Sequence, residues 1–343
     1  MEKRFLGRSG LQVSALSFGL MTFGGTGMFK SVGTTQVEEA ARQIDIAIEA
    51  GVTLFDTADI YSGGQSEEIL AAALGDKREK IIIATKVYGM MGKGDHDRGL
   101  SRQHIIAACE ASLRRLKTDR IDLYQVHNFD SLVPVEETLR ALDDLVRAGK
   151  VRYIGSSNHF GWQLTKAMGV SERLGLERYI SQQIQYSLMV RDVEVEMLPA
   201  GVAQGVGALI WSPLAQGYLS GKFEAAASAG SRLEASGRIS IYDTERGHKI
   251  VAVLREIAAA HEGATPSQVA LNWLLTRPGV TSVIIGARTE AQLRDNLAAA
   301  GWSLTAEEAE RLDRVSAVPV GYPEVQHGFF HPERNLPVFP RVK

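Results

Sequence analysis

The chain has 343 residues, 45% of them hydrophobic and 23% charged, a balance typical of a globular enzyme rather than a disordered or fibrous protein. Its formal net charge of −2 argues against a nucleic-acid or anionic-membrane partner, and no apolar run approaches the roughly 18 residues of a membrane-spanning helix. The N-terminal MEKRFLGRSG has no apolar core of a secretion signal, and the single Cys109 cannot form an internal disulfide. We therefore expect a cytoplasmic location and a buried thiol at Cys109.

Strand-like and helix-like patterns alternate along the chain. Residues 3–13 predict a β-hairpin around Gly7–Gly10, and LSFG (16–19) predicts the first core strand. Further strands are expected near 53–56, 81–86, 120–126, 151–155, 180–184, 207–211 and 281–285. Helices are expected near 35–50, 66–74, 101–116, 134–149, 160–174, 192–200, from 248 onward, and over 266–276, 289–299 and 305–315.

Eight strands, mostly each followed by a helix, favour a closed (β/α)8 barrel, the TIM barrel, over an open doubly wound sheet. No Pro/Ser-rich linker or charge block divides the chain, so we expect one domain over 1–343, with 316–343 as a C-terminal tail or substrate loop. The segments 87–100, 212–247 and 316–343 are too long for ordinary connections, and long loops are often functional. We expect all three to lie on the catalytic face or to reach it.

Four polar side chains stand at or just after the ends of three apolar runs. Asp56 and Tyr61 follow the strand TLFD, Lys86 ends IIIATK, and His127 ends IDLYQVH. Each alone has an ordinary explanation, such as a cap, a packed phenol, a surface charge or a core histidine. Because parallel strands bring these ends to one face, the four together can move a proton beside a carbonyl group. The pattern predicts an NAD(P)H-dependent carbonyl reductase.

Other common sites are not indicated by the sequence. The run Gly24–Gly27 does not spell the G-x-G-x-x-G of a Rossmann fold. GYLSGK (217–222) is one residue short of a phosphate-binding P-loop, and Phe223 replaces the hydroxyl residue that would hold magnesium. The eight histidines and one cysteine form no metal-binding spacing, so no metal site is expected.

The strand-end residues and several later segments resemble the aldo-keto reductase superfamily. These segments are GSSNHF, Gln183, IWSPLAQGYLSGKF and VIIGARTEAQLRDNL, and the resemblance spans about residues 3 to 315. WSPLAQG and the long loop after it are most similar to the branch of potassium-channel β-subunits and their bacterial relatives. The resemblance implies a (β/α)8 barrel that binds NADP(H) and reduces aldehydes or ketones to alcohols reversibly.

The resemblance also implies roles for individual residues. Tyr61 would be the general acid, Lys86 would favour its ionised form, Asp56 would fix Lys86, and His127 would orient the substrate oxygen. Ser157, Asn158 and Gln183 match contacts to the nicotinamide carboxamide, and Trp211, otherwise a strand-end core aromatic, matches the platform under the ring. The further cofactor positions are Met21, Thr22, Ser212, Pro213, Leu214, Gln216, Gly217, Lys222, Arg232, Gly286, Arg288, Gln292 and Asn296.

The chain departs from the family pattern where the adenosine end of the cofactor would bind. Gly286 and Ala287 replace a Lys-Ser pair, and Gln292 replaces an arginine, which leaves Arg288 as a substitute cation. NADP(H) is therefore the expected cofactor, with NAD(H) also used.

An apolar or bulky small-molecule carbonyl substrate is expected. The expected substrate-lining residues are Phe23, Tyr88, Met90 and Phe129, with further apolar candidates at Met91, Tyr322, Phe329 and Phe330. An alternative function is a redox-sensing regulatory subunit that binds NADP(H) and turns over slowly. The sequence does not indicate an oligomeric state.

Overall fold

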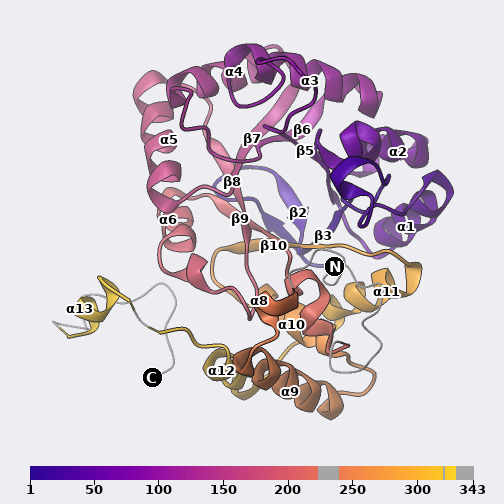
Figure 1. Cartoon of the computed structure of the whole chain (residues 1–343), viewed down its shortest axis with the longest axis vertical. Helices are drawn as coiled ribbons and strands as arrows, with labels where there is room; N and C mark the ends of the chain where they lie inside the picture. The colour runs from indigo at the N-terminus through magenta and orange to yellow at the C-terminus, as the bar shows by residue number, and fades with distance from the viewer. Residues whose placement is uncertain (223–238, 320, 330–343) are drawn as a thin grey trace.

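The computed structural model describes residues 1–222, 239–319 and 321–329, so Arg232 and Phe330 lie outside the described residues. Within them, eight parallel strands close into a barrel in the order β10-β3-β4-β5-β6-β7-β8-β9 (Figure 1). This arrangement confirms the predicted (β/α)8 barrel. The strands are β3 (Leu16–Gly19), β4 (Leu54–Asp56), β5 (Ile82–Val87), β6 (Ile121–Val126), β7 (Val151–Ser157), β8 (Tyr179–Gln185), β9 (Gly207–Trp211) and β10 (Val280–Ile285).

Helices surround the barrel and cover its outer surface, as Figure 1 shows. The α-helices are α1 (Val37–Glu49), α2 (Gln65–Leu74), α3 (Arg102–Leu116), α4 (Val135–Arg147), α5 (Gly161–Leu174), α6 (Met197–Gln204), α8 (Ile239–Tyr242), α9 (Glu245–Ala260), α10 (Pro266–Leu275), α11 (Glu290–Ala298), α12 (Ala306–Val315) and α13 (Glu324–Phe329). Short 3-10 helices are η1 (Gly27–Phe29), η2 (Tyr61–Gly64), η3 (Arg78–Lys80), η4 (Asp192–Glu194), η5 (Ala215–Ser220) and η7 (Ala299–Gly301).

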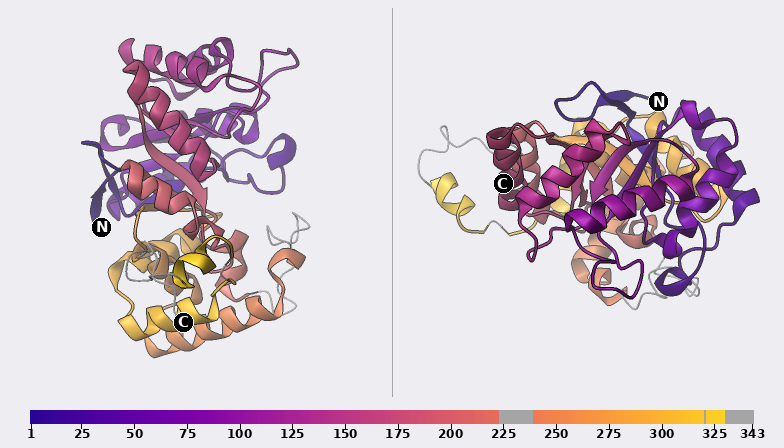
Figure 2. Two further views of the ribbon diagram at one scale, coloured as in Figure 1. Left: turned by 90° about the vertical axis from the view of Figure 1, so that its left-hand side faces the viewer. Right: turned by 90° about the horizontal axis from the view of Figure 1, so that it is seen from above.

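The N-terminal hairpin closes one end of the barrel. Strands β1 (Lys3–Phe5) and β2 (Gln12–Ser14) pair antiparallel, as expected from the sequence. Leu6 and Val13 are fully buried and pack with Leu54, Leu123 and Leu209 from the barrel strands. In the right-hand view of Figure 2, the indigo hairpin lies across one side of the barrel. The carboxyl ends of the strands are thus left as the open end, where barrel enzymes carry their active sites.

Apolar periodicity and caps explain most of the helices. In α4 the buried residues include Val135, Leu139 and Leu142, a spacing that places them on one face. The side chain of Thr305 accepts a bond from the N–H of Glu308, and the Glu308 carboxylate accepts one from the N–H of Thr305. The expected capping box of α12 is therefore present.

Three local expectations differ from the structure. The helix expected over 192–200 is divided into η4 and α6, whose N-cap Glu196 has a non-helical backbone. Helix α9 begins at Glu245 rather than near His248, because the Thr244 side chain caps it through the N–H of Gly247. The tail, which lacks a clear helical period, nevertheless forms the short helix α13.

A buried ionic network fastens the end of α12 to the loop after β8. Arg191 is 4% exposed and donates two bonds to Glu194, at 2.8 and 2.9 Å. Its guanidinium also donates to the Ser316 hydroxyl at 2.8 Å, and Tyr186 donates its hydroxyl to Glu194. Because the charged groups of this network are paired and hydrogen-bonded to one another, their attraction offsets the cost of removing them from water.

Candidate active site

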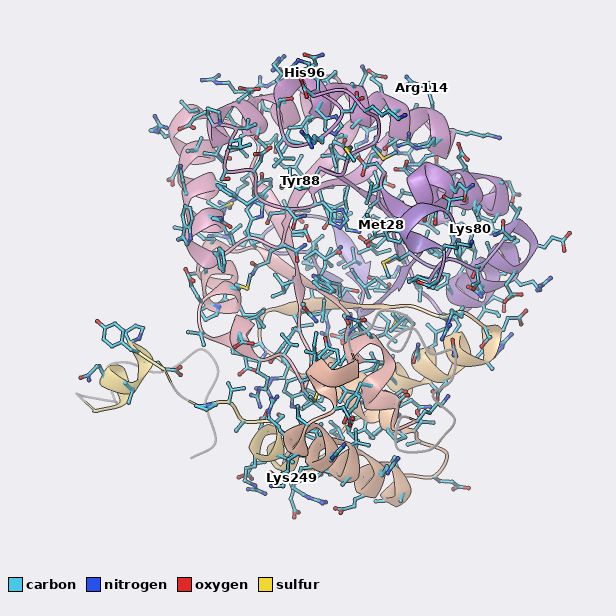
Figure 3. The ribbon with its side chains drawn as sticks, viewed as in Figure 1. Met28, Lys80, Tyr88, His96, Arg114 and Lys249 are labelled. Atoms are coloured by element: carbon cyan, nitrogen blue, oxygen red, sulfur yellow. The ribbon has the colours of Figure 1, made fainter. Side chains whose placement is uncertain are left out.

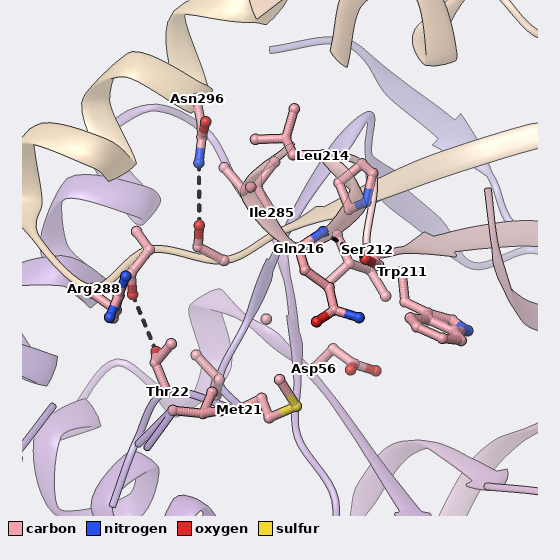
Figure 4. A pocket seen from close by; sticks show the side chains of 18 of the residues that line it. Met21, Thr22, Asp56, Trp211, Ser212, Leu214, Gln216, Ile285, Arg288 and Asn296 are labelled. Atoms are coloured by element: carbon pink, nitrogen blue, oxygen red, sulfur yellow. Dashed lines mark hydrogen bonds between the residues drawn. The ribbon is translucent and has the colours of Figure 1, made fainter. Parts of the chain in front are cut away.

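A cavity of about 620 Å³ opens at the carboxyl ends of the barrel strands. Its wall includes side chains from the loops after β3, β4, β6, β7, β9 and β10, and Figure 4 shows part of it. Of the four catalytic candidates, Asp56, Tyr61 and His127 line the cavity, and Lys86 lies directly behind them with no exposed surface. The structure therefore brings the four predicted strand-end residues together at one end of the barrel.

The ammonium of Lys86 is held by three acceptors. It donates to Asp56 Oδ1 at 2.5 Å, to the carbonyl oxygen of Thr57 at 2.8 Å and to the hydroxyl of Tyr61 at 3.3 Å. A lysine ammonium has three N–H donors, so all of them are used. The side chain is thus fixed with its charge against the Tyr61 hydroxyl.

The electrostatics of the site follow from this arrangement. Burial by itself would lower the pKa of Lys86, but Asp56 and Tyr61 outweigh it, and the pKa lies above its usual value. Burial, together with the charge of Lys86, lowers the pKa of His127 to about 3. At neutral pH the site therefore holds a charged lysine and a neutral imidazole, whose ring lies edge-on to Tyr61 at 5.8 Å between centroids.

Two glutamines hold the other oxygen of Asp56. Gln183 donates to Oδ2 at 2.7 Å and Gln125 donates to the same atom at 3.2 Å. Gln183, expected to contact a nicotinamide carboxamide, therefore also orients the carboxylate that fixes Lys86. Sequence reasoning missed Gln125, although it stands two residues before His127 in β6 and so points to the same side of the strand.

A tight turn aims Tyr61 at the lysine. Ser62, Gly63 and Gly64 all have positive φ angles, of 52°, 65° and 96°. Glycine adopts this left-handed backbone at little cost, whereas Ser62 needs support. The Ser62 hydroxyl provides that support, because it accepts a bond from the N–H of Gly25 at 3.0 Å and donates to the Phe23 carbonyl at 3.2 Å.

A second buried carboxyl, Asp59, lies in the chain between Asp56 and Tyr61. It is fully buried, and neither of its oxygens has a hydrogen-bond partner of ordinary geometry among the described residues. Burial, and to a lesser extent the nearby Glu67, raises the pKa of Asp59 to about 8, although the Ile60 N–H, Arg115 and Lys86 act in the opposite direction. The group is thus mostly protonated at neutral pH, a state that the sequence alone did not indicate.

The residues expected to contact the nicotinamide lie on the cavity wall and are bonded to one another. Trp211 donates its indole N–H to Asn158 Oδ1 at 3.1 Å, and Asn158 donates its amide to the His127 carbonyl at 3.0 Å. Ser157 donates to the Gln183 carbonyl at 3.0 Å. These bonds place Trp211 and Asn158 beside the catalytic candidates. Ser212, Pro213, Leu214, Gln216, Gly217 and Lys222 continue the wall after β9.

Another part of the cavity wall, away from Trp211 (Figure 4), is formed by the segment after β10. Asn296 donates to the Gly286 carbonyl and Thr22 donates to the Ala287 carbonyl, both at 3.1 Å (Figure 4). Arg288 follows, two residues before α11 begins, and its backbone N–H donates to Gln292 Oε1 at 2.9 Å. The expected positions Met21, Thr22, Gly286, Arg288, Gln292 and Asn296 all line the cavity, as do Ser267 and Asp295, which sequence reasoning missed.

The expected substrate residues do not line this cavity. The expectation for Phe23 is wrong, because its ring is fully buried and lies edge-on to Phe18 in the core. Tyr88 packs against the core instead, and Phe129 contacts His159 and Trp162. Met90 is 58% exposed, outside the cavity wall.

The tail candidates do not form a cavity wall either. Tyr322 is 84% exposed, and neither it nor Met91 belongs to the lining residues. The side chain of Phe329 and all of Phe330 lie outside the described part of the chain. Apolar residues that line the cavity, and that sequence reasoning missed, include Met28, Phe29, Val32 and Ile60.

Comparison with known proteins identifies the family. The model of the Aldo/keto reductase family matches residues 15–317. The chain belongs to the aldo/keto reductase family.

This aldo/keto reductase is 38% identical over 332 residues to the "Uncharacterized oxidoreductase YrpG" of Bacillus subtilis, covering 94% of this chain and 98% of the relative. It is 37% identical over 312 residues to a "Probable voltage-gated potassium channel subunit beta" of Arabidopsis thaliana, covering 87% and 91%. A "Putative voltage-gated potassium channel subunit beta" of Schizosaccharomyces pombe is 37% identical over 324 residues, covering 91% and 92%. The resemblance stated from the sequence is confirmed.

Two further properties of this aldo/keto reductase concern membranes and metals. Among the residues that the structure describes, no helix is both long and apolar enough to cross a bilayer. The same residues contain no cluster of three or more His, Cys, Asp or Glu side chains suited to a metal ion.

Proposed function

We propose that this aldo/keto reductase reduces aldehydes and ketones to alcohols with NADPH, reversibly, and that Tyr61 is the general acid. The observation that supports this most is the buried ammonium of Lys86, 3.3 Å from the Tyr61 hydroxyl. A phenol is a weak acid at neutral pH, and an adjacent positive charge stabilises the phenolate that forms when it gives up its proton. Tyr61 can then protonate a carbonyl oxygen at neutral pH.

The other side chains would prepare this transfer. Asp56 and the two glutamines bonded to it keep Lys86 from rotating away. The neutral His127 can donate one N–H to the substrate oxygen, which positions that oxygen near Tyr61. Both donors act in a largely buried site, where they stabilise the developing oxyanion more than they would in water. Reduced nicotinamide, when bound, supplies the hydride.

The residues of the cavity suit a nicotinamide dinucleotide. The wall includes Trp211, whose ring offers an apolar platform, and the cations Lys222 and Arg288. Gly217 and Gly286 each face open space where a Cβ would stand, which leaves room for a ligand against the backbone. The start of α11 adds a preference for an anion close to Arg288.

The same region supports a moderate preference for NADPH over NADH. Arg288 can make charge-assisted bonds to a 2′-phosphate, each worth roughly 1.5–3 kcal/mol. Gly286 and Gln292 supply no further cation, and the carboxylate of Asp295 stands on the same part of the wall. We therefore propose that NADPH binds about tenfold to a hundredfold more tightly and that NADH is still used.

A second candidate function is a regulatory subunit that binds NADP(H) and turns over slowly. The similarity to two proteins described as potassium-channel β-subunits favours it. The catalytic residues would be the same in both cases, so only the turnover rate separates them. Steady multiple turnovers of a simple aldehyde favour the reductase, whereas a single slow turnover favours the regulatory role.

The experiment follows NADPH absorbance in the presence of para-nitrobenzaldehyde. We expect steady turnover by the wild type and a loss of about 10²–10⁴-fold in Tyr61→Phe, with NADPH binding nearly unchanged. Tyr88→Phe is the matched control, because Tyr88 lies outside the cavity wall and should keep wild-type activity. Near-normal turnover by Tyr61→Phe would remove Tyr61 from the role of proton donor.

A further inference from the structure

A buried ion pair that the proposed mechanism does not use lies next to the segments that carry Lys86 and Tyr61. Glu67, in the first turn of α2, has no exposed surface and accepts a bond from Arg115 Nε of α3 at 2.6 Å. Arg114, labelled in Figure 3, is exposed on the outside of the molecule, whereas the next side chain, Arg115, is only 18% exposed. A buried ion pair is often no more stabilising than apolar side chains of similar volume, so its position points to another role.

One end of the pair is bonded to the strand that carries Lys86. The hydroxyl of Thr85, the residue before Lys86 in β5, donates to Glu67 Oε1 at 2.6 Å. Ser66, the neighbour of Glu67, shares a hydrogen bond with the Thr57 hydroxyl at 2.8 Å. The carbonyl of Thr57 is in turn an acceptor of the Lys86 ammonium. The first turn of α2 is therefore joined to Lys86 by two routes, through β5 and through one of its acceptors.

The other end of the pair packs against the turn that carries Tyr61. A Cβ added at Gly64 would lie 2.7 Å from Cδ and 2.8 Å from Nε of Arg115, so the arginine occupies the space of a side chain there. Gly64 ends the run of positive φ angles that begins directly after Tyr61. Arg115 also donates to the Ser112 hydroxyl of its own helix at 3.2 Å, which limits its movement. The guanidinium thus supports the backbone of this turn from the side of α3.

The charged and titratable groups that face the ion pair or Tyr61 come from β4, β5, β6, α3 and the loops after the strands. They are Asp56, Asp59, Lys86, Cys109, Tyr124 and His127. Burial raises the pKa of the Cys109 thiol to about 12 and that of the Tyr124 phenol well above its usual value, so both stay neutral near pH 7. Asp59, with a pKa of about 8, titrates within the range of a kinetic assay and has to be controlled.

We propose that Glu67 and Arg115 are a positioning pair, which holds the turn of Tyr61 against the end of β5 and so keeps the Tyr61 hydroxyl beside the Lys86 ammonium. This inference rests on the proposed reductase function and adds two residues to it. The attraction between charges falls with distance, so a turn that moves away from Lys86 leaves Tyr61 a weaker acid. Neither Glu67 nor Arg115 lines the cavity, so NADPH binding should not depend on them.

The experiment measures kcat for para-nitrobenzaldehyde over a pH series, together with the Kd of NADPH. We expect Arg115→Met to lower kcat about tenfold to a hundredfold while the Kd of NADPH stays close to that of the wild type. The pH above which the rate declines should rise by about 0.5–1 unit, the direction expected for Lys86→Met. Arg115→Lys, which can still donate to Glu67, should recover part of both effects. Thr85→Val, which has the same shape and removes one bond to Glu67, should show a smaller shift in the same direction.

Arg114→Met is the matched control, because it removes the same charge from the adjacent, exposed position of α3. Arg78→Met is a second control, since its pair with Asp122 at 2.9 Å is also mostly buried but lies where β5 and β6 begin. Neither control should shift the pH profile. An unshifted profile in Arg115→Met, or an equal shift in either control, would overturn the inference. If Arg115→Met fails to fold, Thr85→Val decides, and an unshifted profile there overturns the inference as well.

The pH series is repeated with Asp59→Asn added to the wild type and to each variant, because Asp59 titrates in the same range. A shift that disappears in this background belongs to Asp59 and contradicts the role of the ion pair. If the wild type did not turn over the aldehyde, or if Tyr61→Phe stayed fully active, the proposed function itself would fail, a result separate from the others.

Discussion

Replacement of Asp59 by asparagine tests whether the buried carboxyl between Asp56 and Tyr61 in the chain is protonated. The pKa of Asp59 rises from its usual 3.8 to about 8 because the group is buried and because Glu67 is close. An acid whose pKa is raised on folding binds its proton more tightly in the folded state. The contribution of Asp59 to the stability of the folded state is therefore greatest below about pH 4, and it is lost as the pH rises from about 4 to about 8.

The magnitude follows from the two pKa values. Each pH unit inside this window costs about 1.4 kcal/mol, so the loss reaches about 4 kcal/mol by pH 7. Asparagine has nearly the same shape and does not ionise, so Asp59→Asn removes this pH dependence. The amide of the introduced asparagine is also buried, which changes the free energy of unfolding by the same amount at every pH. The test therefore depends on how the free energy of unfolding changes with pH and not on its absolute value.

The assay is urea unfolding followed by tryptophan fluorescence at pH 5, 6 and 7. We expect the stability of Asp59→Asn relative to the wild type to rise by about 1.4 kcal/mol per pH unit over this range. Asp76→Asn, at an exposed position, serves as the control, and its free energy of unfolding should change with pH in the same way as that of the wild type. Parallel curves for Asp59→Asn would refute the reasoning, because they would mean that Asp59 is ionised throughout.

The other predictions concern catalysis, cofactor choice and stability. Lys86→Met should lower turnover at least about a hundredfold and shift the pH profile of the residual rate to higher pH, as measured by kcat over a pH series. An unshifted profile would contradict the role of the ammonium. Arg288→Ala should bring the Kd values of NADPH and NADH close together in fluorescence titrations, and an unchanged ratio would assign the 2′-phosphate to another cation. Glu194→Gln should destabilise the fold by about 3–5 kcal/mol in urea unfolding, because it leaves Arg191 buried without its full counter-charge, and a change below about 1 kcal/mol would mean that water reaches the guanidinium.

The sequence predicted the site best where regular strands determine the position and direction of the side chains. Parallel strands in a barrel end on one face, so the positions of Asp56, Lys86 and His127 at strand ends sufficed to predict that they would meet. The same alternation along β6 could have identified Gln125, which faces the same side as His127. Regular structure thus fixes both the location and the direction of a side chain.

The irregular turns were harder to interpret, because no periodicity gives the direction of a side chain there. Phe23 and Phe29 stand six residues apart in the same glycine-rich segment, yet the first is buried in the core and the second faces the cavity. Asp59 differs from Asp56 in a similar way, since only the fold decides which carboxyl gains partners and which is buried without them. Whether such a side chain is buried or hydrogen-bonded depends on contacts between segments that are distant in the chain, and these contacts cannot be read from a single sequence.

The seam between β3 and β10 joins the first and last strands of the barrel. Leu16, Ser17 and Phe18 pair with Val283, Ile284 and Ile285, and the hydroxyls of Ser17 and Ser282 meet across 265 residues of chain. At synthesis rates of about 5–20 residues per second, β3 waits tens of seconds on the ribosome for its partner. During that time its unpaired edge is a template for a neighbouring chain, so a nascent or truncated chain that stops before Val283 is exposed to aggregation in a way that the finished barrel is not.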